Sequence, residues 1–361
     1  MIPERLPEYV DRGGRQVWRP PYTARGAEVF GFVVQCDQEA IDRLLRRDLV
    51  EPSRGAVDYR CAHDHVMVVF AKIGELSSDE RRDSQRGYVS ECEVAVWCLA
   101  ADVLAGGRLL WYLPYVFVDS GQAAASGREV YGYPKQMAEF EGNFPESLAK
   151  PGTTTVQAQA IASYGRDQEA VLQPMISATR AKGAGDDGSE LDALRQLFVG
   201  GLGVDTTLPF GARPRPSATI TSLDAPPPRA AQQRTPAAWA ARRVIDTLSG
   251  RGLRFGAERL VLDMMASPML VFLKQFRDVA CPTKACYQAV VEAPLGVHAG
   301  GAQYHPLDAQ LYQIVFGNYD SHPIADELGV KADKPLQAAF AFNARFDFDI
   351  ELGYEVWRAP T

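Results

Sequence analysis

The sequence predicts a β-rich α+β domain that is interrupted by a mostly helical insertion. Strand-like segments dominate both ends of the chain, one helical pattern lies among the first of them, and the composition changes between about residues 175 and 265. With 361 residues the chain is long enough to bury a large core. We therefore expect a single domain over residues 1–361, with the insertion as an excursion from it.

The first third of the chain predicts strands with one helix. Residues 28–35 (EVFGFVVQ) are β-branched and aromatic, as in a half-buried strand. Asp37 then offers an N-cap for a helix over residues 38–50, where apolar residues recur near the helical period. The following segments are rich in valine and aromatic residues and predict consecutive strands: 65–73, 91–100 and 108–119.

The insertion combines a loop, two helices and a proline-rich stretch. Residues 189–201 predict a short helix between a serine cap and two glycines, and residues 236–250 a second helix with proline at its first position. Residues 208–234 are rich in proline and lack periodicity. Strand-like segments then return and complete the β-rich domain: 270–276, 284–294, 309–320 and 336–357.

Charge and composition exclude several classes of protein. The chain has 38 basic and 45 acidic residues, so its net charge is −7 and it lacks the basic field that dominates nucleic-acid affinity. It contains no apolar run of the roughly 18–20 residues that span a bilayer. Its first residues do not form the apolar region of a secretory signal. We therefore expect neither a nucleic acid nor a membrane as a partner.

The six cysteines are scattered and form no CxxC pair. A disulfide framework is improbable in so long a chain, so we expect reduced thiols and a cytoplasmic protein. The sequence also lacks a glycine-rich phosphate loop, a GxSxG elbow and an HExxH motif.

One segment stands apart as a candidate site. After the strand that ends at Asp119, a stretch of small residues leads into a turn in which Gly132 and Pro134 favour a tight, rigid backbone. The turn presents Lys135 among aromatic residues. Burial there would disfavour the ammonium form, and a neutral amine is the form that attacks a carbonyl group. A solvated surface lysine is the alternative interpretation.

The segment GREVYGYPK (127–135) resembles the signature of the acetoacetate decarboxylase family, in which the lysine after Tyr-Pro forms a Schiff base. Weaker likenesses lie in the strand before it, in residues 28–45, and in residues 272–294. The resemblance implies an antiparallel, partly closed, barrel-like sheet. It also implies a homo-oligomer and a lyase that acts on a small keto acid without metal or organic cofactor.

Carried over to this sequence, the resemblance assigns two catalytic residues. Lys135 is the Schiff-base lysine. Glu91 matches the glutamate near it, with Glu93 as the alternative within ECE. The other assignments divide into substrate-binding residues, namely Arg25, Tyr131, Tyr133 and Gln136, and residues that fix the turn, namely Arg128, Glu129, Gly132 and Pro134. For Arg128 and Glu129 we expect an ion pair and backbone hydrogen bonds.

Three positions depart from the family pattern. Gln136 replaces the second lysine, so cationic repulsion cannot lower the pKa of Lys135 and burial must do so alone. No second glutamate occurs in the strand before Glu91. The family arginine would fall near Ala27, and Arg25 would share its strand face if the chain were extended. Aldol condensation with dehydration, or ligand binding without catalysis, are therefore alternatives to decarboxylation.

Histidines give weaker candidates. His63 and His65 have a spacing that places two metal ligands on one strand face, but the sequence shows no third ligand, so we expect no metal. His298, His305 and His322 could include an acid of the pocket.

Overall fold

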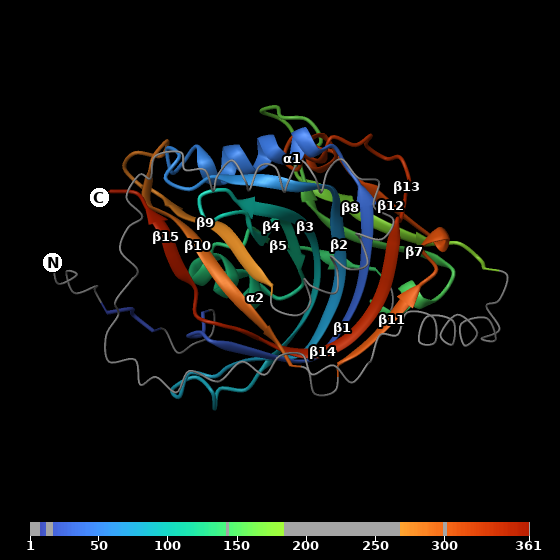
Figure 1. Cartoon of the computed structure of the whole chain (residues 1–361), viewed down its shortest axis with the longest axis horizontal. Helices are drawn as coiled ribbons and strands as arrows, with labels where there is room; N and C mark the ends of the chain where they lie inside the picture. Colours follow the sequence, from blue (N-terminus) through green and yellow to red (C-terminus); the bar gives the residue numbers. More distant parts are fainter. Residues whose placement is uncertain (1–7, 12–16, 142–143, 184–267, 299–301, 361) are drawn as a thin grey trace.

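The computed structural model describes residues 8–11, 17–141, 144–183, 268–298 and 302–360. In this part of the chain most residues lie in two β-sheets, and the helices are short (Figure 1). The helices predicted at 189–201 and 236–250 lie outside the described residues. The strand that ends at Arg180 reaches past the start predicted for the insertion, because residues 175–180 pair within a sheet.

The larger sheet contains ten strands and closes on itself. Its order is β11-β14-β1-β2-β3-β4-β9-β10-β15, and a further pairing of β10 with β14 completes a ring. The pairs are antiparallel except for β4 with β9 and β4 with β5. The bounds are β1 Tyr22–Gln35, β2 Tyr59–Ser78, β3 Val89–Asp102, β4 Arg108–Val118, β5 Lys135–Met137, β9 Met269–Arg277, β10 Ala285–Val297, β11 Gln303–Leu307, β14 Phe340–Ile350 and β15 Tyr354–Arg358. The predicted antiparallel, partly closed sheet is confirmed.

The smaller sheet has five strands in the order β13-β12-β8-β7-β6. It packs against the outer face of the ring, at the right of Figure 1. Its strands are β6 Glu139–Phe140, β7 Gly152–Ala160, β8 Val171–Arg180, β12 Tyr312–Phe316 and β13 Leu336–Gln337. Alternating side chains of β1 to β4 therefore enter two different cores, one between the sheets and one inside the ring.

Helix α1 (Gln38–Leu45) covers the outside of the ring beside the smaller sheet (Figure 1). Its predicted cap is confirmed, because an Asp37 carboxylate oxygen accepts a hydrogen bond from the Ala40 amide at 3.0 Å. The helix buries Ile41, Leu44 and Leu45. It continues into a π-helical turn at Arg46–Val50.

The remaining helical segments are short. They are α2 Gly121–Ser126, the π-helical turn Gly127–Tyr131, the 3-10 turns Glu146–Ala149 and Ala309–Leu311, and α6 Ile324–Leu328. None of the helices in the described ranges has the length and apolarity needed to cross a bilayer.

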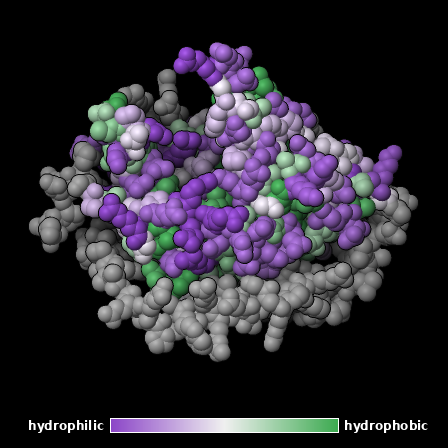
Figure 2. Space-filling view, turned by 90° about the horizontal axis from the view of Figure 1, so that it is seen from above, coloured by the Kyte–Doolittle hydropathy of each residue, from purple (hydrophilic) through white to green (hydrophobic). Residues whose placement is uncertain are grey.

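The apolar residues gather inside the fold. On the face seen in Figure 2 the described surface is mostly hydrophilic, with apolar residues in small separate groups. All six cysteines are free, as predicted, and Cys36, Cys61 and Cys98 are buried. The cytoplasmic location and the homo-oligomer stay predictions.

Candidate functional site

The site lies in the core inside the ring, where side chains from β1 to β4, β9, β10 and β14 surround a cavity of about 140 Å³. Nearly all of its lining is apolar. Lys135, Glu91 and Glu93 are the charged residues among the described lining residues.

Lys135 enters this cavity from β5. Because neighbouring residues of a strand point to opposite faces, Lys135 faces the cavity and Gln136 faces the outer core. The Gln136 side-chain oxygen lies 2.5 Å from Nε2 of His322, so both residues belong to the packing between the sheets. Gln136 is not among the described lining residues, so the geometry does not support its predicted substrate-binding role, which stays a prediction.

Two carboxylates meet the amine of Lys135. Its Nζ lies 2.5 Å from Oε1 of Glu91 and 3.0 Å from Oε2 of Glu93. Both glutamates come from β3, two residues apart, and therefore share one face of the strand. Glu91 is fully buried, and its Oε2 has no hydrogen-bond partner. Glu91 thus lies beside Lys135 as predicted, and Glu93 places a second carboxylate there; the catalytic role of Glu91 stays a prediction.

The protonation states of Lys135, Glu91 and Glu93 depend on one another, because one ammonium group lies beside two carboxylates. Burial lowers the pKa of Lys135, but the Glu91 and Glu93 carboxylates raise it by more, so the pKa lies above the ordinary value. The expectation that burial alone yields a neutral amine is therefore wrong. Burial, together with repulsion from Glu93, raises the pKa of Glu91 to about 7 despite the attraction of Lys135. A proton can therefore enter or leave the cluster near neutral pH.

The backbone before Lys135 makes room for its side chain. Helix α2 begins after Ser120, whose hydroxyl accepts a hydrogen bond from the Ala123 amide at 3.2 Å, and continues into the π-helical turn. A Cβ atom on Gly127 would lie 2.9 Å from Cδ of Lys135. Sequence reasoning predicted only a stretch of small residues here; the Ser120 cap before an alanine run was the available signal for the helix.

The turn itself has the predicted geometry. Gly132 has φ +91°, and a Cβ atom there would lie 2.7 Å from Cα of Lys274. The Arg128 guanidinium donates a hydrogen bond to the Lys135 carbonyl at 3.2 Å. Within the described part of the chain Arg128 and Glu129 do not form the expected ion pair. Arg128 contacts the turn through its hydrogen bond to the backbone instead.

The two tyrosines of the turn line the cavity. Their rings meet edge to face, with centroids 5.8 Å apart. The Tyr131 hydroxyl donates to the carbonyl of Glu351 at 3.0 Å, which anchors the turn to the chain after β14. Nζ of Lys135 lies 5.7 Å from the Tyr133 ring centroid.

Arg25 does not reach the cavity. The pairing of β1 with β14 shifts between Ala24 and Ala27, and Gly26 has φ +61°. This irregularity breaks the alternation of side chains, so Ala27 lines the cavity while Arg25 is exposed. The expectation that Arg25 shares the strand face of Ala27 is therefore wrong, and its substrate contact stays a prediction.

Trp97 was not predicted as a site residue. It lies on the same face of β3 as the two glutamates and lines the cavity next to Trp111, with ring centroids 5.8 Å apart. The Trp97 indole N–H is buried and has no hydrogen-bond partner among the described residues. Trp97 lies an even number of residues after Glu91 and Glu93 on the same strand, which was the available signal that it shares their face.

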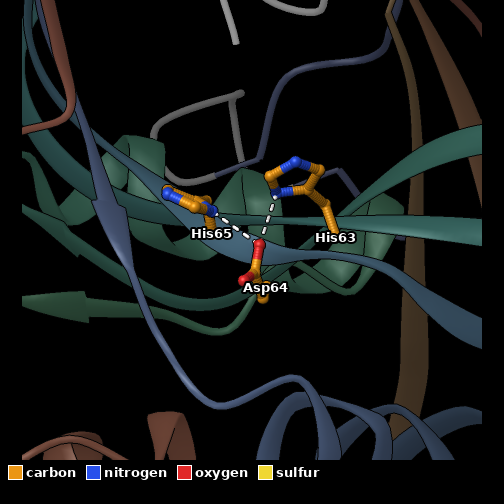
Figure 3. Close-up of side chains that lie close together, drawn as sticks. All are labelled: His63, Asp64 and His65. Atoms are coloured by element: carbon orange, nitrogen blue, oxygen red, sulfur yellow. Dashed lines mark hydrogen bonds and ion pairs between the residues drawn. The ribbon is translucent and has the colours of Figure 1, made fainter. Parts of the chain in front are cut away.

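A second cluster lies on β2, outside the cavity lining. One Asp64 carboxylate oxygen lies 3.2 Å from Nδ1 of His63 and 2.7 Å from Nδ1 of His65 (Figure 3). The pairing of β2 with β3 shifts between Cys61 and Val66, and in this irregular stretch all three side chains converge. Asp64 thus adds a third possible ligand atom beside the two histidine nitrogens, so the three residues could together hold a metal ion.

The comparisons with known proteins show what this chain is similar to. Residues 7–166, which include β1 to β5 and the segment 127–135, match the family model described as acetoacetate decarboxylase (ADC). The predicted resemblance to the acetoacetate decarboxylase family is therefore confirmed over this segment. A search of curated protein sequences finds no match.

Solved structures extend the likeness of fold to nearly the whole chain. An acetoacetate decarboxylase from Legionella pneumophila is 14% identical with a TM-score of 0.51, and the alignment covers 99% of this chain and 94% of that one. An acetoacetate decarboxylase-like enzyme from Sphingomonas wittichii RW1 is 12% identical, with a TM-score of 0.48 and 94% of each chain covered. The enduracididine biosynthesis enzyme MppR, complexed with pyruvate, is 13% identical, with a TM-score of 0.48 and coverage of 94% and 92%.

Proposed function

We propose that the protein is a carbon–carbon lyase of the acetoacetate decarboxylase type, in which Lys135 forms a Schiff base with a carbonyl substrate such as a keto acid. One observation carries this proposal: the lysine amine lies inside an apolar cavity, 2.5 Å and 3.0 Å from two carboxylates. An amine in such a cavity is shielded from water, and an adjacent base can activate it.

The two glutamates have a role in the first step. Because the pKa of Lys135 is raised, the ammonium must lose a proton before it attacks. In the proposed mechanism Glu91 accepts that proton, and the free amine adds to the carbonyl carbon. The carbinolamine oxygen takes up protons and leaves as water, which forms the iminium ion. A pKa of about 7 allows Glu91 to accept and return the proton at neutral pH.

The iminium ion then serves as an electron sink. In decarboxylation the electron pair of the carbon–carbon bond moves into the iminium ion as carbon dioxide leaves. The enamine that results is protonated on carbon, and water hydrolyses the new imine to release the ketone and restore Lys135.

An aldolase–dehydratase is the second candidate. Here the enamine attacks an aldehyde and the adduct loses water. The absence of an arginine from the described lining favours this candidate on a keto acid and an aldehyde, because decarboxylation needs the substrate carboxylate held in position, whereas in the aldol reaction that group does not react.

Borohydride trapping tests the Schiff base. The protein is incubated with acetoacetate, pyruvate or a larger keto acid, reduced, and analysed by intact and peptide mass. We expect a substrate-sized adduct on the Lys135 peptide that disappears in Lys135→Met. The control is Lys274→Met, which removes a lysine whose Nζ lies 5.3 Å from the Tyr287 ring centroid, outside the cavity lining.

The mass of the adduct separates the reactions, since decarboxylation removes carbon dioxide before reduction. No adduct with any carbonyl compound, from folded protein, would overturn the proposed function and favour the non-catalytic ligand-binding alternative.

A further inference from the structure

The side chains that line the cavity beyond Lys135 determine which ligands fit there. Along β3 the face that carries Glu91 and Glu93 continues to Trp97. Trp97 lies four positions after Glu93 on the strand, which corresponds to roughly 13 Å. The charged groups therefore occupy one end of the cavity, and the other end is lined by apolar side chains.

Neighbouring strands continue this apolar wall. Across β3 and β2, Glu93 pairs with Ala71 and Ala95 with Val69, and the next pair along is Trp97 with Met67. Met67 and Val69 line the cavity, as does Phe342 of β14. Three strands thus present only carbon and sulfur atoms, or the neutral indole N–H of Trp97, to a ligand that extends beyond the lysine.

The charge at the lysine end opposes an anionic ligand. Two carboxylates surround one ammonium group, and no arginine or histidine occurs among the described lining residues. A ligand carboxylate would find no cationic side chain among the described lining residues other than Lys135, whose charge the two glutamates already offset. An uncharged ligand needs no such partner.

We propose that the site takes an uncharged carbonyl compound whose carbonyl carries an apolar group of about six carbons. This proposal rests on the Schiff base of the proposed function for the carbonyl group, and on the apolar wall for the rest. It selects the aldol candidate, because a ligand without a carboxylate has no carbon dioxide to lose. The volume of about 140 Å³ sets the size, since an apolar cavity of roughly 150 Å³ accommodates benzene. The apolar group lies between Val69 and Trp97 while Lys135 attacks the carbonyl carbon.

A series of methyl ketones tests the substrate class. Borohydride trapping is measured for acetone, 2-butanone, 2-pentanone, 2-hexanone and 2-octanone, with acetoacetate and pyruvate as small anionic compounds. Each buried methylene group contributes about 0.8 kcal/mol, so the half-saturating concentration should fall about fourfold per added carbon until the chain has about six carbons. A flat series, or tighter trapping of acetoacetate or pyruvate than of 2-hexanone, would overturn the proposal.

A narrowed cavity tests the location of the apolar group. In Val69→Phe the added ring fills the space before Trp97, so we expect acetone trapping to be retained and 2-octanone trapping to weaken at least tenfold. Val171→Phe is the matched control, because Val171 lies on β8 and is 47% exposed. Equal trapping of 2-octanone by wild type and Val69→Phe, with the latter folded, would place the group elsewhere and contradict the proposal.

The matching 2-alkanols separate failure of this proposal from failure of the proposed function. They cannot form an imine, so quenching of tryptophan fluorescence by 2-hexanol reports the apolar wall alone. Binding that tightens with chain length, without trapping of any ketone, would overturn the Schiff base and uphold the ligand class. Trapping of ketones without any dependence on chain length would uphold the Schiff base and overturn the ligand class.

Discussion

The lysine cluster in the cavity and the histidine cluster on β2 differ in how the backbone brings their side chains together. Glu91 and Glu93 share a face of β3 and meet Lys135 from β5, whereas His63, Asp64 and His65 converge in an irregular stretch of β2. The Glu91 side chain is fully buried, whereas Asp64 is 43% exposed. Burial therefore dominates the pKa of Glu91, whereas the more exposed Asp64 responds mainly to its histidine neighbours.

The pKa values of Glu91 and Asp64 are shifted in opposite directions. Burial raises the pKa of Glu91 to about 7, even with an ammonium group beside it. At Asp64 burial also raises the pKa, but hydrogen bonding and attraction from the histidines lower it by more, so the net direction is downward. A carboxylate can exchange protons at neutral pH only where the surroundings penalise its charge.

The largest expected effect comes from removing the buried carboxylate. We expect Glu91→Gln to slow borohydride trapping about 1000-fold, since loss of a general base typically costs 100- to 10,000-fold. The matched change Asp64→Asn should alter the rate by less than roughly twofold, because Asp64 is remote from the reaction and its charge is screened by solvent. Similar losses in both variants would mean that the two clusters do not differ in function.

The pH dependence of borohydride trapping distinguishes Glu91 further from the carboxylate of the histidine cluster. Because Glu91 accepts the proton only when ionised, wild-type trapping should rise as the pH passes through about 7, and this rise should be absent in Glu91→Gln.

A raised pKa also means that the stabilisation from Glu91 is present below its ordinary pKa and is lost as the pH rises through 7. Thermal unfolding at pH 5 and pH 8 should therefore show a smaller change in Tm for Glu91→Gln. An unchanged rate profile in this variant would exclude Glu91 as the base.

The position of Lys135 is the next target. In Gly127→Ala the new methyl group would lie 2.9 Å from Cδ of Lys135 and displace it. A displacement of about 1 Å can lower a rate about 100-fold, so we expect a loss of that order in the trapping rate. Gly121→Ala, at a position with open space around it in the same helical segment, is the control and should keep the wild-type rate. Equal rates in the two variants would show that the lysine tolerates displacement.

Removing the second carboxylate should produce a smaller change. Repulsion from Glu93 raises the pKa of Glu91, so Glu93→Gln should shift the rise in trapping to a pH below 7. The measurement is the pH midpoint of the trapping rate. A midpoint that stays at 7 or moves upward would contradict the assignment of the rise to Glu91.

The smallest effect belongs to the histidine cluster. Burial and the neighbouring His65 lower the pKa of His63, so its contribution to stability is present above pH 6.5 and is lost as the pH falls. His63→Gln should therefore reduce the difference in denaturation midpoint between pH 8 and pH 5, by an amount worth less than about 1 kcal/mol because the side chain is partly solvated. Trapping should be unaffected. A larger loss of stability on acidification in the variant would reverse the expected sign.

Much of the local structure follows from the sequence. Asp37 caps α1 as its side chain predicts, and the β-branched and aromatic runs form the strands of the ring. The Gly132 turn is also predictable, since its φ of +91° and its close contact with Lys274 exclude a side chain. These features depend on residues that are near one another in the chain.

The sequence-based expectations fail where pairing between strands that are distant in the chain determines the position of a side chain. Arg25 was expected beside Ala27, but Gly26 interrupts the alternation, and only the pairing of β1 with β14 reveals this. The neutral state expected for Lys135 fails because β3 brings two carboxylates to an amine that lies more than forty positions further along the chain.

The sequence by itself therefore determined the resemblance to the acetoacetate decarboxylase family, the β-rich architecture and the turn that presents Lys135, because each is encoded by local residue type or by a contiguous motif. The closure of the ring through β10 and β14, the protonation of the lysine and the apolar wall that ends at Trp97 were decided only by the tertiary structure. Burial and pairing between distant strands are properties of the folded chain, and the pKa of a charged group depends on both.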